Sequence, residues 1–161
     1  MKHHAGAEMA MKERLREFDP TGSLQRDCAE IAAIIGGDSD RVANAFFETY
    51  LAHTGFDSRL ASDAQDRIRQ ETERYIRIKF SDPVSEQWAD STRACLRHAN
   101  HHGATIRSVL IAISAGNEFV SDLIDARLKD DGDKRVALQR SLLRLTMIEA
   151  ELLCSDLANT T

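Results

Sequence analysis

The sequence predicts an all-α protein, and three observations lead to that prediction. Its 161 residues include only two prolines and eight glycines, too few for a turn-rich β-protein or a low-complexity chain. Apolar residues recur at helical spacing along most of the chain. Glycines that typically end helices, at Gly36-Gly37, Gly55 and Gly103, separate these stretches.

Length and charge set the organisation that we expect. A chain of 18.0 kDa fits one domain, so residues 11–161 are predicted to form a single unit after a flexible N-terminal tail over residues 1–10. No apolar run approaches the ~20 residues of a membrane span, and no signal peptide is recognisable, which favours the cytoplasm and no membrane contact. The net charge of −5 gives no general attraction to nucleic acid. Cys28, Cys95 and Cys154 lack CxxC spacing and are predicted to be buried, reduced thiols.

Each helix is predicted from its own apolar pattern and end signals. A short helix over 12–18 is followed by a break at 19–23, where Ser23 is the expected N-cap. Ile68, Thr72, Tyr75 and Lys79 form one stripe of an amphipathic helix that ends before Pro83. The predicted helices cover residues 12–18, about 24–35, a stretch capped by Asp38 or Ser39 that ends at Gly55, 63–80, a stretch after Pro83 that ends at Gly103, 105–129 and 134–158.

The last two predicted helices form a long C-terminal pair joined by the polar turn 130–133. Apolar side chains of the final helix cover more than one of its faces, more than one monomer core is expected to bury. We therefore expect a homodimer through this pair. The residues predicted at the interface are Leu142, Leu145, Ile148, Leu152 and the facing side of 105–129.

Residues 66–80, followed eight positions later by Trp88, resemble the E helix and E–F corner of bacterial globin-coupled sensor domains, which are similar to protoglobins. Ala45-Phe46-Phe47 resembles their B-helix motif, and Gly103 resembles the start of their G helix. The resemblance implies a globin-like helical sandwich over residues 20–158. It also implies a haem-binding domain that binds oxygen or another diatomic gas and signals through its C-terminal helices to an output partner.

The sequence departs from this family at two positions, where Ala99 replaces the usual proximal histidine and Phe47 the usual distal tyrosine. Three histidines, His98, His101 and His102, surround the first position. The resemblance makes one of them the haem-iron ligand, with His98 favoured over His102 and His101. Their alternative role is to finish a helix in solvent, where imidazolium favours the C-terminal dipole. His98 and His102 also have a zinc-chelating spacing, but no third ligand accompanies them in the sequence.

The expected distal side lacks the tyrosine hydroxyl that binds oxygen in the family, because Phe47 has no hydrogen-bond donor. Tyr50, Thr72 and Tyr75 are the candidates to supply a hydroxyl, or they pack in the core. The cofactor site implied by the resemblance is formed by His98, His102, Phe47, Thr72 and Tyr75. No phosphate loop, nucleophile elbow or carboxylate pair indicates an enzyme.

The alternative hypothesis is a haem-free globin-fold module for dimerisation or signalling. In that case side chains such as Phe47 and Trp88 would fill the cleft that haem occupies in the family.

Overall fold

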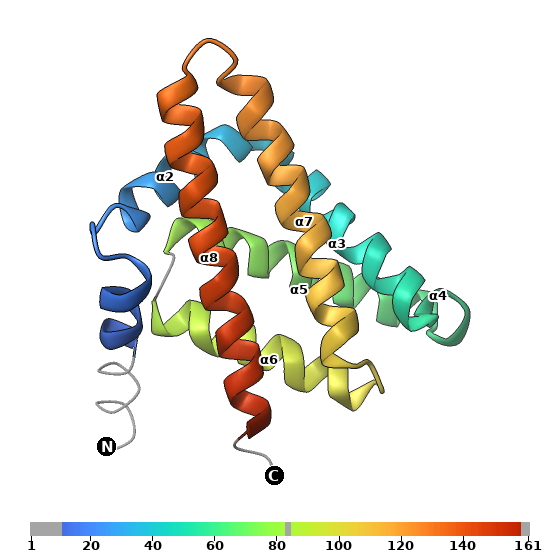
Figure 1. Ribbon diagram of the computed structural model, residues 1–161. Helices are drawn as coiled ribbons and strands as arrows, with labels where there is room; N and C mark the ends of the chain where they lie inside the picture. The colour runs from blue at the N-terminus through green and yellow to red at the C-terminus, as the bar shows by residue number, and fades with distance from the viewer. Residues whose placement is uncertain (1–10, 83–84, 159–161) are drawn as a thin grey trace.

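The computed structural model describes residues 11–82 and 85–158, and every regular element within these ranges is a helix (Figure 1). The all-α prediction is therefore confirmed, whereas the predicted tail over 1–10 lies outside the described residues. A helix over 11–18 precedes α2 (Leu24–Ile35), α3 (Ser39–Thr54), α4 (Phe56–Arg59), α5 (Ser62–Ser81), α6 (Glu86–His101), α7 (Ile106–Arg127) and α8 (Gly132–Ala158). The short helix α4 was not among the predicted elements.

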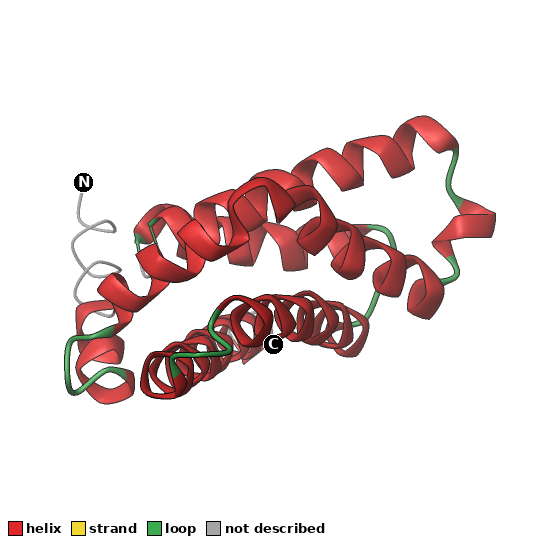
Figure 2. Cartoon of the chain, turned by 90° about the horizontal axis from the view of Figure 1, so that it is seen from above, coloured by secondary structure: helices red, strands yellow, loops and turns green. Residues whose placement is uncertain are grey.

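The helices lie in two layers when the molecule is seen from above (Figure 2). α7 and α8 form an antiparallel hairpin, and α8 passes in front of α5 and α6 in Figure 1. α3 packs against α7, and Gly116 lies where the two helices approach each other. A Cβ on Gly116 would be 3.6 Å from the Phe46 Cβ and 3.7 Å from the Val42 carbonyl oxygen. The small residue therefore permits a close helix crossing.

Helix ends follow local rules only in part, and neither Asp38 before α3 nor Ala61 before α5 makes a side-chain capping bond. Gly55 ends α3 with a φ of +67°, the left-handed conformation that glycine adopts most easily. The side chains of Ser85 and Thr105 cap α6 and α7. The predicted cap at Ser23 is wrong, because its side chain makes no capping bond. The carboxylate of Asp19 instead accepts hydrogen bonds from the backbone N–H groups of Ser23 and Leu24, at 3.1 and 3.0 Å.

The apolar core has two parts. The larger part contains Trp88 and joins α2, α3, α5, α6, α7 and α8. The smaller part contains Phe46, Tyr50, Phe56 and Leu96 and lies at the α3–α6 end of the molecule. All three cysteines were predicted to be buried. Cys28 is buried and Cys95 is half-buried, but Cys154 is exposed, so the prediction is wrong for Cys154.

A buried polar network connects α5, α6, α7 and α8 inside this core. The ammonium of Lys79 contacts a carboxylate oxygen of Glu149 and the side-chain oxygen of Asn117, both at 2.7 Å. The Tyr75 hydroxyl donates to the second carboxylate oxygen of Glu149 and lies 3.3 Å from the hydroxyl of Thr92. Buried charges are tolerated in proteins when they are paired and hydrogen-bonded in this way.

The residues of α8 that were predicted at a dimer interface lie on its inward face instead. Leu142, Leu145, Ile148 and Leu152 are all buried within the described chain, so they pack the monomer core. The large apolar side chains that α8 exposes are Val136, Leu143 and Met147. The predicted contact residues were wrong because α8 packs against α2, α6 and α7 and buries most of its apolar side chains itself.

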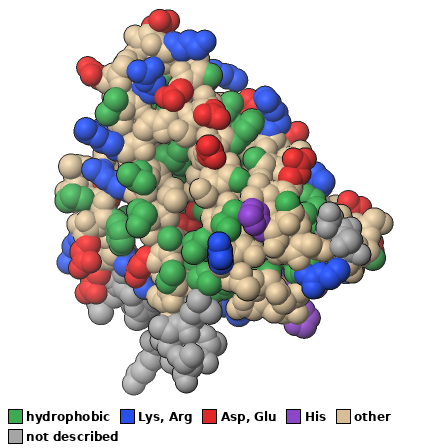
Figure 3. All heavy atoms as spheres, turned by 45° about the vertical axis from the view of Figure 1, so that its right-hand side comes forward, with side chains coloured by type: hydrophobic (Ala, Val, Ile, Leu, Met, Phe, Trp, Pro, Cys, Tyr) green, Lys and Arg blue, Asp and Glu red, His purple; other side chains and the backbone are tan. Residues whose placement is uncertain are grey.

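Surface charge is mixed on the face drawn in Figure 3, where acidic and basic side chains alternate without a broad basic area. None of the described helices is long and apolar enough to cross a membrane.

Candidate functional site: a cleft between α5 and α6

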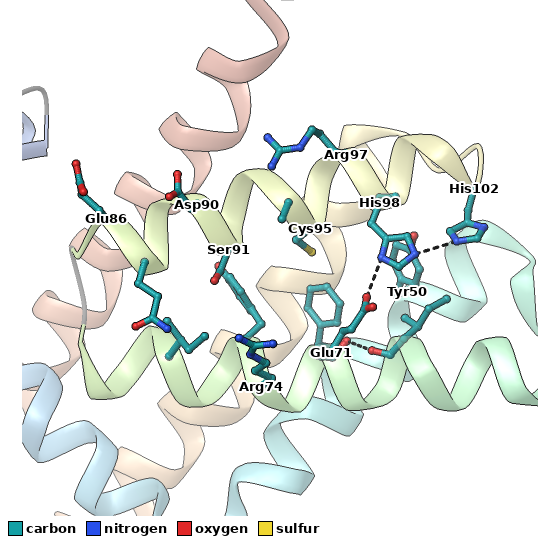
Figure 4. A pocket seen from close by; sticks show the side chains of 18 residues that line it. Tyr50, Glu71, Arg74, Glu86, Asp90, Ser91, Cys95, Arg97, His98 and His102 are labelled. Carbon is teal, nitrogen blue, oxygen red and sulfur yellow. Dashed lines mark hydrogen bonds and ion pairs between the residues drawn. The ribbon is translucent and has the colours of Figure 1, made fainter. Parts of the chain in front are cut away.

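A cleft with a volume of about 950 Å³ lies between α5 and α6 and extends to α3 (Figure 4). Buried side chains form its inner part and include Phe46, Tyr50, Thr72, Tyr75 and Ala99. Exposed polar and charged residues form its rim and include Glu71, Arg74, Gln87, Asp90 and Arg97. The cleft thus combines an apolar interior with a charged rim, as small-molecule sites commonly do.

The helical repeat determines which side chains of α5 and α6 face inward at the two walls of the cleft. On α5, Thr72, Tyr75 and Lys79 are three and four residues apart and face inward. On α6, Trp88, Thr92, Leu96 and Ala99 do the same, and this helix ends at His101 before Gly103 takes a φ of +81°. The cluster His98, His101 and His102 therefore lies at the C-terminal end of the α6 wall.

Two of these histidines line the cleft and contact each other. The Nε2 atoms of His98 and His102 are 3.0 Å apart, and Nδ1 of His98 lies 2.8 Å from a carboxylate oxygen of Glu71 on the opposite wall (Figure 4). For a neutral His98, this network assigns the ring proton to Nδ1, where it is donated to Glu71. Nε2 of His98 then accepts the proton that Nε2 of His102 donates. His101 is exposed and does not line the cleft.

The pKa of His102 lies below its ordinary value of 6.5, chiefly because of burial and then because of His98 and His101. A lowered folded-state pKa means that His102 stabilises the fold fully above pH 6.5, and that this contribution is lost as pH falls through the lower value. NMR titration of the ring is expected to show a midpoint below 6.5. In His98→Ala the midpoint should rise but remain below 6.5, because burial is the larger cause. A wild-type midpoint above 6.5 would contradict this account.

The hydroxyl groups near the cleft differ in their availability. The Thr72 hydroxyl donates to the carbonyl of Ile68 at 2.8 Å, and the Tyr75 hydroxyl is bound to Glu149. The Tyr50 hydroxyl has no hydrogen-bond partner within the described ranges, although its ring packs between Phe46 and Phe56. Burial raises the pKa of Tyr50 to about 12, so the hydroxyl stays protonated and can donate. Of the three hydroxyls predicted from the sequence, that of Tyr50 is therefore the one available to donate to a bound ligand.

Phe47 stands apart from the other predicted cofactor residues. It is buried but does not line the cleft, and its ring lies under the guanidinium of Arg69, 4.5 Å from the ring centroid. The structure thus brings His98, His102, Thr72 and Tyr75 to one cleft and leaves Phe47 outside it.

Two further residues of the cleft, Glu71 and Cys95, bear on the chemistry that it could perform. Glu71 was not singled out in the sequence, because its contact with His98 depends on how α5 and α6 pair. Cys95 also lines the cleft, but burial raises the pKa of its thiol to about 12, with Glu149 and Glu71 adding to the rise. A thiol with so high a pKa is a poor nucleophile at neutral pH.

Over residues 11–82 and 85–158, no group of three or more histidine, cysteine, aspartate or glutamate side chains is arranged to hold a metal ion. In comparisons with known proteins, the chain matches no family model and no curated protein sequence.

Proposed function

We propose that this chain is a haem-binding, globin-like sensor domain that binds oxygen or another diatomic gas. The observation that carries the proposal is the cleft itself, which has two imidazoles at the C-terminal end of α6 on one wall and the available Tyr50 hydroxyl of α3 in the same lining. The helix order and the resemblance of residues 66–80 to globin-coupled sensors support it.

The residues of the cleft fit haem in size and chemistry. A volume of about 950 Å³ lies near the upper end of the ~300–1,000 Å³ typical of cofactor sites. The buried interior suits the apolar face of a porphyrin, and Arg74 at the rim is suited to a propionate. When bound, haem would supply an iron that can bind a diatomic gas.

His98 is the residue that we assign as the iron ligand. Its Nδ1–H is held by Glu71, which leaves the Nε2 lone pair for the metal. Carboxylates that orient a histidine in this way also raise its basicity as a ligand. To act so, His98 must exchange its contact with His102 for the iron. His102 and then His101 remain the alternatives.

The expected test is a spectrum of the purified chain titrated with haemin. One equivalent should produce a Soret band that shifts when carbon monoxide is added. His98→Ala should abolish the band or weaken haem binding strongly, whereas His101→Ala, the matched control, should leave it unchanged. Loss of the band in His102→Ala alone would transfer the ligand to His102. No stoichiometric band in the wild type would refute the proposal.

Tyr50 is the expected donor to bound oxygen. Tyr50→Phe removes only the hydroxyl, so bound oxygen should dissociate faster while the haem spectrum persists. Thr72→Val is the control, because the Thr72 hydroxyl already bonds to a backbone carbonyl. Flash photolysis or stopped flow measures the rate of oxygen dissociation from each variant. Equal oxygen dissociation from Tyr50→Phe and wild type would remove Tyr50 from this role.

Signal transmission is proposed to run from the cleft to α8. Tyr75 lines the cleft and bonds directly to Glu149 of α8, so a change at the α5 wall reaches the C-terminal helix through one contact. A two-state displacement of α8 would then alter whatever it contacts, including an output partner.

The same helix is proposed to form a homodimer through its outward face. Val136, Leu143 and Met147 are exposed, and with Arg140 they follow the alternating spacing of four and three residues that characterises helix–helix seams. A parallel pairing would place Arg140 against its own copy. An antiparallel pairing centred between Leu143 and Met147 avoids that repulsion, because Arg140 then lies opposite Ala150. We therefore favour the antiparallel arrangement.

The second candidate is a haem-free signalling module of the same fold. Ala99, at the position of the family's proximal histidine, favours it, because Ala99 is buried and supplies no ligand. A melting temperature that is equal with and without haemin supports this candidate. A large rise with haemin excludes it, because a ligand of the folded state stabilises that state.

A further inference from the structure

Two imidazoles converge at the end of α6. His98 and His102 are four residues apart, which places them on one face of a helix. Their Nε2 atoms are 3.0 Å apart, and both rings are half-buried at the cleft, where ions in solution can reach them. The third histidine, His101, has its ring centroid 5.4 Å from that of His102 in an edge-on arrangement.

The separation of the two nitrogen atoms indicates which ion would suit them. Imidazole nitrogens bind divalent transition metals at about 2.0–2.1 Å. Two such bonds to atoms 3.0 Å apart enclose an angle of roughly 95°. This angle is closer to neighbouring positions of a square-planar or octahedral site than to a tetrahedral site. Nitrogen ligands in tetragonal geometry are typical of Cu²⁺ and Ni²⁺ rather than of structural Zn²⁺.

We propose that His98 and His102 form a two-histidine chelate for a divalent copper or nickel ion, with water at the remaining positions. Glu71 acts as a positioning residue, because it holds Nδ1 of His98 and turns Nε2 toward His102. Binding requires His102 to move its ring proton from Nε2 to Nδ1, a change of tautomer that leaves its charge unaltered. The ion would replace the present Nε2–Nε2 hydrogen bond.

This inference does not depend on haem. It uses the same imidazoles that the proposed function offers to iron, so a bound copper or nickel ion and haem ligated at His98 should exclude each other. Such exclusion would make the divalent ion a regulator of haem loading.

The test titrates the haem-free full-length chain with CuCl₂, NiCl₂ or ZnCl₂ alone. His3 and His4 are both changed to alanine in every variant, because imidazoles there would bind the same ions. Calorimetry should show one Cu²⁺ per chain, bound more tightly than Zn²⁺. Electron paramagnetic resonance should show coupling to two imidazole nitrogens.

The variants separate the chelate from adventitious binding. His98→Ala and His102→Ala should each weaken Cu²⁺ binding at least tenfold and reduce the nitrogen coupling to one imidazole. His101→Ala should change neither. Glu71→Gln should weaken binding by about 10–100-fold, as loss of an outer partner commonly does. Binding that survives both His98→Ala and His102→Ala, or Zn²⁺ binding tighter than Cu²⁺, would overturn the proposal, whatever the haemin titration shows.

Discussion

Lys79→Met is expected to lower the free energy of unfolding by about 3–5 kcal/mol, the usual cost of removing one partner from a buried ion pair. Methionine fills a similar volume but leaves the carboxylate of Glu149 in the core with only the Tyr75 hydroxyl as a donor. Both charged side chains are almost completely buried, 1% and 0% exposed, so water cannot take the place of the ammonium. Urea denaturation followed by circular dichroism measures the change.

Two further variants identify the cause. Lys79→Met combined with Glu149→Leu should recover most of the lost stability, because an apolar pair leaves no unpaired charge. Lys134→Met is the matched control, because Lys134 forms an ion pair with Glu30 at 2.6 Å on the surface, where such pairs contribute little. If Lys79→Met and Lys134→Met destabilise the chain equally, the buried network has no special role in stability.

The network also shows which contacts could not be predicted from the sequence. Lys79 was expected on the same helix stripe as Thr72 and Tyr75, and it does lie there. Its partner Glu149 is 70 residues away in the sequence. A local pattern identifies which face of a helix turns inward, but it does not reveal which residue of another helix meets that face.

Helix positions were predictable because their signals are local. Apolar spacing, Gly55 and the proline after residue 82 correctly placed α2, α3 and α5 to within one or two residues. The start of α2 was misread, because the Ser23 side chain caps no backbone N–H, whereas the Asp19 carboxylate accepts from the backbone N–H groups of Ser23 and Leu24. Capping by a side chain from outside the usual position depends on the path of the loop.

The candidate site was only partly predictable for the same reason. The histidine cluster was visible in the sequence, and the structure places His98 and His102 at the cleft. Which hydroxyl is available could not be read from spacing. Thr72 and Tyr75 line the cleft, but backbone and Glu149 already bind their hydroxyls, and this leaves Tyr50.

The second large effect is expected from two leucines of α8 that lie two residues apart, one on its inward face and one on its outward face. Leu145 is fully buried, whereas Leu143 is 62% exposed. Leu145→Glu places a carboxylate in the core without a partner, so it should cost several kcal/mol of folding free energy or prevent folding. Leu143→Glu should leave the fold intact, because its carboxylate reaches water. Denaturation curves of the two variants measure this difference.

Leu143→Glu should nevertheless separate the proposed homodimer, because the antiparallel seam places Leu143 of one copy against Met147 of the other. A carboxylate at that position would face the apolar Met147 side chain of the other copy and lose most of its water there, which weakens the interface. Sedimentation of the wild type at micromolar concentration should therefore show a dimer, and Leu143→Glu should show a folded monomer with native circular dichroism. A wild type that sediments as a monomer would refute the seam, and a dimeric Leu143→Glu would move the interface to another face. If Leu145→Glu instead gave a folded monomer, α8 would have to turn its inner face toward a partner, and the core packing of Leu145 would be wrong.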